Sequence, residues 1–181
     1  MIQITCSAKD TKIPEVAANR QAHELSTRST KNLLPKLHLR KIQKKDERVL
    51  LAWRNDVTTR NNFLNNNFIS EAEHTKYINE TINHPQRTQF ILEYNQIPVG
   101  TIRGTTLSDN KIELYYHVCP LFRGRKIGQQ MMELYLSERK GNFLCKVKNQ
   151  NIPSIKMIEK FGFKLFKTDA EINFYGLSKI R

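Results

Sequence analysis

Cysteine is scarce in this chain of 181 residues, which contains only three cysteines and no C-x-x-C pair. The odd number and the wide spacing exclude a small disulfide-stapled scaffold and a zinc site built on paired cysteines. We therefore expect Cys6, Cys119 and Cys145 to be buried or incidental thiols in a reducing compartment. A cytoplasmic location and the absence of a metal cofactor are expected on the same grounds.

Long apolar runs are also missing. No stretch approaches the roughly 18 apolar residues of a membrane helix. Polar residues follow Met1–Cys6 at once, where a signal peptide would have its apolar core. We expect no insertion into a membrane.

Acidic residues are few, because 17 Asp and Glu stand against 30 Lys and Arg, which gives a formal net charge of +13. Such an excess favours anionic partners, such as nucleic acid, an acidic membrane surface or a phosphorylated small molecule. The cations are scattered, and no zinc-finger spacing, basic zipper or aromatic RNA-binding motif accompanies them. Nucleic acid is therefore not the partner we expect, although a basic nucleic-acid-binding module without catalysis stays open as an alternative.

The residues that are present suffice for one packed domain, since 39% of them are hydrophobic. Residues 1–36 differ from the rest, being polar, rich in Ser, Thr and Ala, and interrupted by Pro14 and Pro35. We interpret them as an N-terminal extension that is partly flexible. Residues 37–181 form the expected folded domain.

Period-two patterns and turn signals predict strands at residues 37–42, 89–94, 99–105, 111–118, 143–147, 163–167 and 172–177. Four helices are expected: from the N-cap region at Asp46 to Asp56; from the capping box Ser70–Glu73 to His84; from Ile127 to a glycine cap at Gly141; and from Asn151 to Gly162. We expect the chain to break at 61–67. The second helix should carry Ala72, Thr75, Ile78 and Ile82 on one face. This order predicts a mixed α/β class with a largely antiparallel sheet of about seven strands flanked by about four helices.

The most informative stretch is Val118–Gly128, which joins a predicted strand to a predicted helix through a turn with two glycines and three cations. A helix start has unpaired N–H groups and a partial positive charge, so it can hold a phosphate group. Glycine at 124 and 128 permits a ligand to approach the backbone closely. The alternative is a plain helix start whose cations face water. A P-loop and a dinucleotide loop are excluded, because neither Gly-Lys-Ser/Thr nor a G-x-G-x-x-G after a strand occurs.

The same residues, V-x-P-x-x-R-G-x-x-I-G, resemble the acyl-CoA-binding motif of the GNAT superfamily of N-acetyltransferases, Q/R-x-x-G-x-G/A. Arg123 fills the first position and Gly128 the last, whereas Lys126 replaces the middle glycine. A second signature of the family, N-x-x-S-I-x-x-x-E-K-x-G-F, is similar to residues 151–163. The resemblance covers residues 37–181. It implies a GNAT acyltransferase domain that transfers acetyl from acetyl-CoA to a primary amine by direct attack.

The resemblance also implies which residues bind the acyl donor. The CoA pyrophosphate is expected on Arg123, Gly124, Arg125, Lys126, Ile127 and Gly128. The backbone of Val118 is expected to pair with the pantetheine arm and to polarise the thioester carbonyl. Asn151 and Ser154 are expected on the CoA arm. The structural alternatives are core packing for the side chains of Val118 and Ile127, and helix capping for Asn151 and Ser154.

Three candidates for acid–base chemistry, Glu113, Tyr115 and His117, lie on one face of a strand because side chains alternate with a period of two. Glu113 is the first candidate for the general base, acting through water, because many members of the family have a glutamate near this point. His117 is the second, since the ordinary pKa of histidine is about 6.5; its structural alternative is a sheet histidine that is hydrogen-bonded to a neighbour. The family's tyrosine acid falls in register with Ile158, so Tyr115 or Tyr116 serves instead, or the thiolate leaves unaided.

A subgroup of the family is resembled by W-R-N-D at 53–56, I-S-x-x-E-H at 69–74 and V-G-x-x-R at 99–103. Its members acetylate nucleotide-linked 4-amino sugars, as in pseudaminic-acid pathways of surface-glycan biosynthesis. The resemblance implies a sugar nucleotide as acceptor and a substrate-binding role for Arg54, Asn55, Glu73, His74 and Arg103. The structural alternatives are a surface ion pair for Arg54 and the capping box for Glu73.

Other acceptors and other classes stay open. The acceptor can instead be a protein N-terminus, a polyamine or another small amine. The departures at Lys126 and Ile158 also suggest a degenerate GNAT fold that binds CoA without catalysis. A homodimer stays open as well.

Overall fold

The computed structural model describes residues 37–179, and the extension predicted for residues 1–36 lies outside them. The described residues form one seven-stranded sheet in the order β1-β2-β3-β4-β5-β7-β6. Only the β4–β5 pair is parallel. The predicted class, a mixed and largely antiparallel sheet, is confirmed. The strands are β1 (Leu37–Lys41), β2 (Arg87–Tyr94), β3 (Ile97–Thr106), β4 (Ile112–Val118), β5 (Gly141–Lys148), β6 (Lys164–Thr168) and β7 (Ile172–Lys179).

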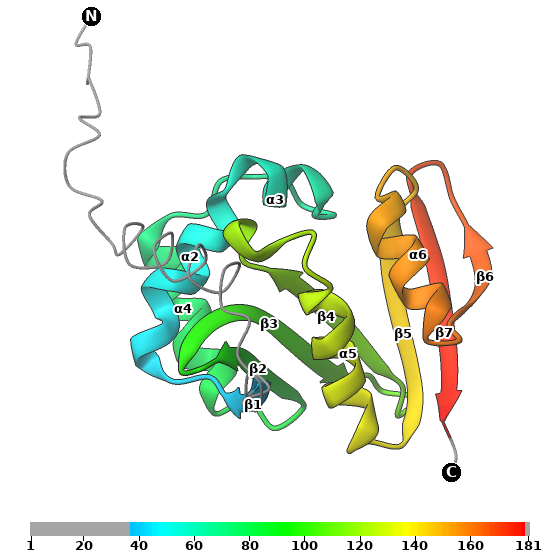
Figure 1. Ribbon diagram of the computed structural model, residues 1–181, viewed down its shortest axis with the longest axis horizontal. Coiled ribbons are helices and arrows are strands. Elements are labelled where there is room, and N and C mark those ends of the chain that lie inside the picture. The colour runs from blue at the N-terminus through cyan, green and yellow to red at the C-terminus, as the bar shows by residue number, and fades with distance from the viewer. Residues whose placement is uncertain (1–36, 180–181) are drawn as a thin grey trace, which may run out of the picture. The chain divides into compact units, whose positions relative to one another are not determined.

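Helices cover both faces of this sheet. They are α2 (Glu47–Asn55), α3 (Val57–Asn62), α4 (Glu71–Ile82), α5 (Ile127–Ser137) and α6 (Ile152–Lys160), with short 3-10 turns η1 (Lys44–Asp46) and η2 (Pro120–Phe122). In Figure 1, α5 and α6 lie in front of the sheet. Successive side chains of β4 alternate between the faces: the Tyr116 hydroxyl reaches Ser154 of α6, whereas the His117 ring contacts Trp53 of α2. No described helix has the length and apolar character needed to cross a bilayer.

The central strands β4 and β5 separate after three residue pairs, Ile112–Phe143, Glu113–Leu144 and Leu114–Cys145. β4 continues to Val118 and β5 to Lys148 without pairing further, and Figure 1 shows them diverging between α3 and α6. Cys119 donates its N–H to the Val99 carbonyl at 2.9 Å, on the β3 side of the strand. Because backbone groups alternate sides along an antiparallel strand, the N–H and C=O of Val118 face the gap.

One helix was not predicted, and one predicted cap residue has a further role, where polar residues compete for the backbone. Helix α3 occupies Val57–Asn62, next to the expected chain break, because the Asp56 carboxylate accepts from the Thr59 N–H at 2.8 Å and starts a new helix. Asp46 is the N-cap residue of α2, as expected, but its side chain makes no cap bond to that helix. Its carboxylate pairs with Arg40 at 2.7 Å and closes the capping box of η1 by accepting from the Gln43 N–H.

The buried face of α4 differs from the face that its apolar residues mark, and the predicted glycine cap of α5 was wrong. The buried face of α4 consists of His74, Ile78 and Thr81, while Ile82 is 39% exposed. The buried face of α4 contains polar residues, so a search for apolar side chains at helical spacing does not find it. Helix α5 ends at Ser137, and Gly141 begins β5 with φ of 139°, so no glycine caps that helix. The Ser70–Glu73 capping box and the turn at Gly162, with φ of 87°, are confirmed.

Candidate functional site

A cavity of about 760 Å³ opens where β4 and β5 separate. One side is formed by α2, α3, the loop after α3, α4 and the face of β4 that carries Tyr115 and His117. The other side is formed by the start of α5, β5 and the first turns of α6. Its lining includes most of the predicted site residues, namely Arg54, Glu73, His74, Arg103, Glu113, Tyr115, His117, Val118, Arg123, Gly128, Asn151 and Ser154.

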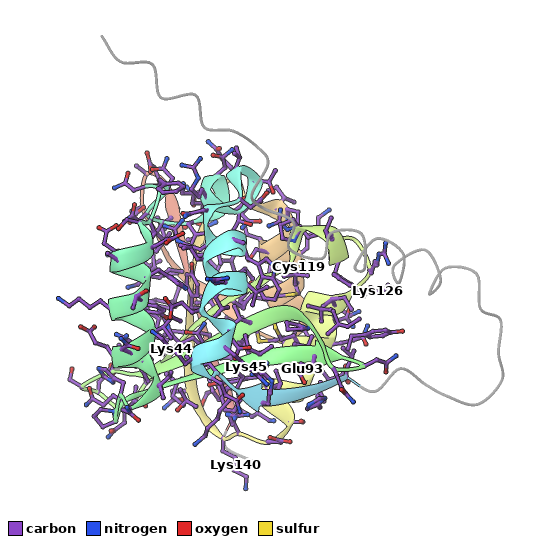
Figure 2. The ribbon with its side chains drawn as sticks, turned by 90° about the vertical axis from the view of Figure 1, so that its left-hand side faces the viewer. Lys44, Lys45, Glu93, Cys119, Lys126 and Lys140 are labelled. Carbon is purple, nitrogen blue, oxygen red and sulfur yellow. The ribbon has the colours of Figure 1, made fainter. Side chains whose placement is uncertain are left out.

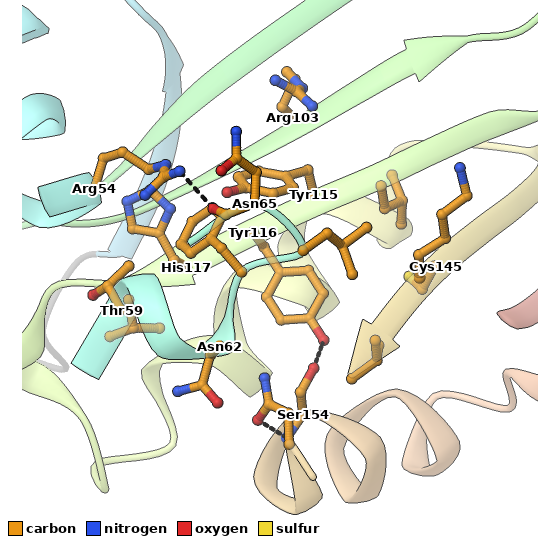
Figure 3. Close-up of a pocket in the computed structure, with 18 of the residues that line it drawn as sticks. Arg54, Thr59, Asn62, Asn65, Arg103, Tyr115, Tyr116, His117, Cys145 and Ser154 are labelled. Atoms are coloured by element: carbon orange, nitrogen blue, oxygen red, sulfur yellow. Dashed lines mark hydrogen bonds between the residues drawn. The ribbon is translucent and has the colours of Figure 1, made fainter. Parts of the chain in front are cut away.

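On the first side, two guanidinium groups enclose two aromatic rings. Arg54 lies 4.5 Å from the Phe63 ring centre, Phe63 lies 4.8 Å from Tyr115, and Arg103 lies 4.7 Å from Tyr115 on the other side. Arg54 Nη2 also donates to the Asn65 carbonyl at 2.7 Å (Figure 3). Arg54 Nη1 and Arg103 Nε have no hydrogen-bond partner. The stack therefore holds two cations whose hydrogen-bonding capacity is not used up.

A buried chain of hydrogen bonds holds Arg103 in this stack. Arg103 donates to the Tyr77 hydroxyl at 2.8 Å, Tyr77 donates to Gln89 Oε1 at 2.8 Å, and Gln89 donates to the Thr101 hydroxyl at 3.0 Å. Gln89 and Thr101 are buried, so each polar group in the chain needs its partner. Tyr77 and Gln89 were not predicted. The available signal was the polar Gln89 on the strand face that also bears Ile91.

His117 lies in an aromatic box, with Trp53 at 5.9 Å and Phe63 at 5.7 Å between ring centres. Neither ring nitrogen has a hydrogen-bond partner or contact with solvent. Burial lowers the pKa of His117 to about 3, and the charges of Arg123, Arg54 and Arg103 act in the same direction. The ordinary pKa that we expected for this residue is thus wrong, and so is the alternative of a hydrogen-bonded sheet histidine. His117 is neutral at pH 7 and a weak base.

Glu113 stands where β4 and β5 part. Its carboxylate pairs with Lys146 of β5 at 2.8 Å, and its side chain is 27% exposed. Lys146 was not predicted as part of the site. Its partner Glu113 lies on β4, and the sequence alone does not show that β4 and β5 are neighbours in the sheet. Tyr115, two residues on, has its pKa raised by burial, so its phenol stays protonated through the neutral range.

The donor side contains the turn between η2 and α5. Gly124 has φ of 75°, and Lys126, the N-cap of α5, has φ of 59° and ψ of 12°. Lys126 thus adopts the left-handed conformation that glycine favours at the equivalent position of the family motif. Its side chain is exposed and lies at the surface in Figure 2. Gly128 lines the cavity and packs closely against α6, because a Cβ at this position would lie only 3.2 Å from Met157 Sδ.

The side chain of Arg123 binds residues at the start of α3. Its guanidinium donates to the hydroxyls of Thr58 and Thr59 and lies 3.6 Å from the Asp56 carboxylate. The side chain therefore links the donor turn to α3, a contact that the motif did not suggest. Ile127 is 7% exposed and belongs to the core, as its structural alternative predicted.

Asn151 accepts from the Ser154 N–H at 3.3 Å and so caps α6. The capping alternative is thereby confirmed for Asn151, and the Ser154 hydroxyl is left free for another contact. That hydroxyl lies 2.6 Å from the Tyr116 hydroxyl, across the opening between β4 and α6 (Figure 3).

The other predicted acceptor residues divide into two groups. Glu73 and His74 line the cavity: Glu73 closes the capping box by accepting from the Ser70 N–H at 2.9 Å, and buried His74 has a pKa lowered by burial. Asn55 is not among the lining residues. Its side-chain amide makes two bonds to the Ile69 backbone, at 2.8 and 2.9 Å, and fastens the loop after α3.

Comparison with known families decides the classification. Residues 43–163 match the model of the Acetyltransferase (GNAT) family. This chain belongs to the GNAT acetyltransferase family. The prediction of an acyltransferase enzyme is confirmed for it, in preference to a binding module of another class. The family uses acetyl-CoA.

Solved structures show the same fold with several acceptor classes. A CoA complex of RimL, a ribosomal L7/L12 alpha-N-protein acetyltransferase, has a TM-score of 0.70 at 14% identity, over 82% of this chain and 97% of that one. Spermidine N-acetyltransferase from Vibrio cholerae, with CoA and spermine, has 0.68 at 14%, over 79% and 95%. PseH, an N-acetyltransferase of Campylobacter jejuni, has 0.62 at 14%, over 80% and 99%. No curated protein matches the acetyltransferase.

Proposed function

We propose that this acetyltransferase transfers acetyl from acetyl-CoA to the primary amine of a nucleotide-linked amino sugar, by direct attack of the amine on the thioester. The single observation that carries the choice of acceptor is the charge of the cavity lining. Four cations line it, Arg54, Arg103, Arg123 and Lys146, against the two carboxylates of Glu73 and Glu113. One of those carboxylates is already paired with Lys146.

This lining disfavours a polycationic acceptor, because like charges repel most strongly where water is partly excluded. It favours an acceptor that carries phosphate groups beside its amine. Arg54 and Arg103 suit that task, since each guanidinium presents a planar fork of N–H donors and each has one nitrogen without a partner. A polyamine would find only Glu73 unpaired with a cation.

For the donor, the proposal rests on the free end of β4 and on the start of α5. Backbone groups of Val118 face the gap, where an extended pantetheine arm can pair with them as a strand would. The N–H groups at the start of α5, together with exposed Arg125 and Lys126, suit the pyrophosphate.

Glu113 is the proposed general base. The attacking amine must lose a proton as its nitrogen bonds to the acetyl carbonyl carbon, after which the C–S bond breaks and the electron pair leaves with sulfur. A carboxylate at the β4–β5 opening can take that proton directly or through one water. His117 is a weaker candidate, because burial lowers its pKa to about 3.

The test is an acceptor panel with release of CoA thiol as the readout. The panel contains a UDP-linked 4-amino sugar, spermidine and a peptide with a free N-terminus, each with acetyl-CoA. We expect kcat/KM to be highest for the sugar nucleotide, by at least about tenfold, the factor that one charge-assisted contact supplies. Spermidine as the best acceptor would refute the proposal. A peptide as the best acceptor would replace the sugar by a protein N-terminus.

A further inference from the structure

Lys146 of β5 contributes a primary amine to the lining of the cavity. Among the described residues, no other lysine lines it. The side chain of Lys146 is 42% exposed, so its amine is accessible to a bound ligand. Lys146 is also the first residue of β5 beyond the last pair with β4, Leu114–Cys145. It therefore stands at the point where the two strands separate and the cavity opens.

The amine of Lys146 lies against the proposed general base. Its Nζ is 2.8 Å from Glu113 Oε1. Glu113 is the partner of Leu144, two residues before Lys146, so both side chains project from the same face of the sheet. A general base takes its proton from a group about 2.6–3.2 Å away. The Lys146 ammonium thus occupies the position relative to the carboxylate that an acceptor amine has to take.

Other nucleophiles of the lining are less suited to accept an acetyl group. Cys145 precedes Lys146, but burial raises the pKa of its thiol, which stays protonated and therefore unreactive at neutral pH. Burial also raises the pKa of Tyr115 and of Tyr116, so both phenols stay protonated as well. The Ser154 hydroxyl is bonded to the Tyr116 hydroxyl at 2.6 Å rather than to a base.

We propose that Lys146 accepts an acetyl group from bound acetyl-CoA when no acceptor amine occupies the cavity. This inference rests on the proposed function for its donor and for Glu113 as its base, but not on the identity of the acceptor. Glu113 takes a proton from the Lys146 ammonium, and the lone pair of the nitrogen bonds to the acetyl carbonyl carbon. The C–S bond then breaks, its electron pair leaves with sulfur, and the nitrogen loses a second proton. One of the two protons ends on the CoA thiol and the other in solvent.

Acetylation of Lys146 changes the cavity in two ways. The amide is neutral and no longer forms an ion pair with Glu113, so the cavity loses one of its four cations. The acetyl group also adds bulk beside the Glu113 carboxylate, where the acceptor amine has to lie. We therefore expect the acetylated enzyme to be inactive toward acceptors, which makes this modification a self-inactivation in their absence.

The first test is mass spectrometry with peptide mapping after the full chain has been incubated with acetyl-CoA alone. Lys111 is a matched control within the same protein, because its amine pairs with Asp109 at 2.6 Å and its side chain is 45% exposed, but it does not line the cavity. We expect acetylation of Lys146 to be at least about tenfold faster than that of Lys111, because binding places the thioester beside the amine. In Glu113→Gln the rate at Lys146 should fall to that of Lys111. The best amine of the panel should slow acetylation of Lys146 by competition.

The second test measures whether the modification inactivates the enzyme. The wild type and Lys146→Arg, which has no amine to acetylate, are preincubated with acetyl-CoA for increasing times and then assayed with the best amine. We expect the activity of the wild type to fall in step with the acetylated fraction. Lys146→Arg, whatever its starting activity, should show no loss with time.

Three results would overturn the proposal: equal acetylation of Lys146 and Lys111, acetylation of Lys146 at full rate in Glu113→Gln, or full activity of the acetylated enzyme. Transfer to an amine of the panel without acetylation of Lys146 would refute this inference alone. Acetylation of Lys146 without transfer to any amine would refute the proposed function alone. Absence of acetyl-CoA binding, measured by calorimetry, would refute both.

Discussion

Burial of His117 in its aromatic box allows a quantitative prediction of how the free energy of unfolding depends on pH. In the folded protein the pKa of this imidazole is about 3, against an ordinary value of 6.5. Between these values the unfolded chain binds a proton that the folded chain excludes. The folded state therefore loses stability as the pH falls below 6.5, and regains it as the pH rises.

The magnitude follows from the two pKa values. Each pH unit below 6.5 costs about 1.4 kcal/mol, so between pH 7.5 and 4.5 the contribution of His117 is about 2.5 kcal/mol. Replacement by glutamine, which does not titrate, removes this contribution. Loss of the ring also changes stability at every pH, but that offset cancels when the two pH values are compared within each protein.

The assay is urea unfolding of the wild type and His117→Gln at pH 7.5, 6.5, 5.5 and 4.5. We expect the wild type to lose about 2.5 kcal/mol more than the variant over this range. Buried His74, whose pKa is also lowered, contributes equally to both proteins and drops out of the difference. Parallel losses in the two proteins would show that His117 takes up a proton in the folded state, and would refute the reasoning from burial and from the neighbouring arginines.

Three further predictions concern the site and its supporting turn. Arg103→Met should raise KM for the acceptor at least about tenfold without changing the Kd of acetyl-CoA, because a charge-assisted hydrogen bond is lost; steady-state kinetics and calorimetry check this, and an equal change in both constants would contradict it. Glu113→Gln should lower kcat roughly 100-fold or more, as for loss of a general base, while acetyl-CoA binding persists; a kcat within about threefold of wild type would exclude Glu113 as the base. Lys126→Gly should leave the free energy of unfolding, measured by urea unfolding, unchanged or raise it by up to about 1 kcal/mol, because it removes a left-handed lysine but adds the backbone entropy of glycine. Gly124→Ala should lower the same free energy by about 1 kcal/mol, because Gly124 has φ of 75°. Destabilisation by Lys126→Gly would contradict this.

Sequence patterns predicted the scaffold well because its determinants are local. Strand alternation correctly placed Glu113, Tyr115 and His117 on one face of β4. The glycine-containing turn before α5 and the asparagine cap of α6 were recognisable from spacing alone. The Ser70–Glu73 box marked the start of α4 within its own first turn.

The chemistry of the site depended on residues far apart in the chain. The low pKa of His117 requires Trp53 and Phe63, which other elements bring to the ring. The pair between Glu113 and Lys146 depends on the parallel register of β4 and β5. No local pattern contains these partners.

Arg123 shows why a matching motif leaves the role of a side chain open. The motif gave its position at the donor turn, whereas its guanidinium binds Asp56 and two threonines of α3, a helix that the asparagine-rich sequence concealed. Competition among several possible anionic or hydroxyl partners is settled by tertiary packing, and a single sequence does not record it.

The central claim is that Arg54 and Arg103 bind the phosphate groups of an anionic acceptor. One matched pair of substrates tests it most directly. The measurement is kcat/KM, at fixed acetyl-CoA, for a 4-amino sugar in its free form and in its UDP-linked form. We expect at least about a tenfold advantage for the UDP-linked form, lost in large part in Arg103→Met. Equal values for the two forms in the wild type would contradict it.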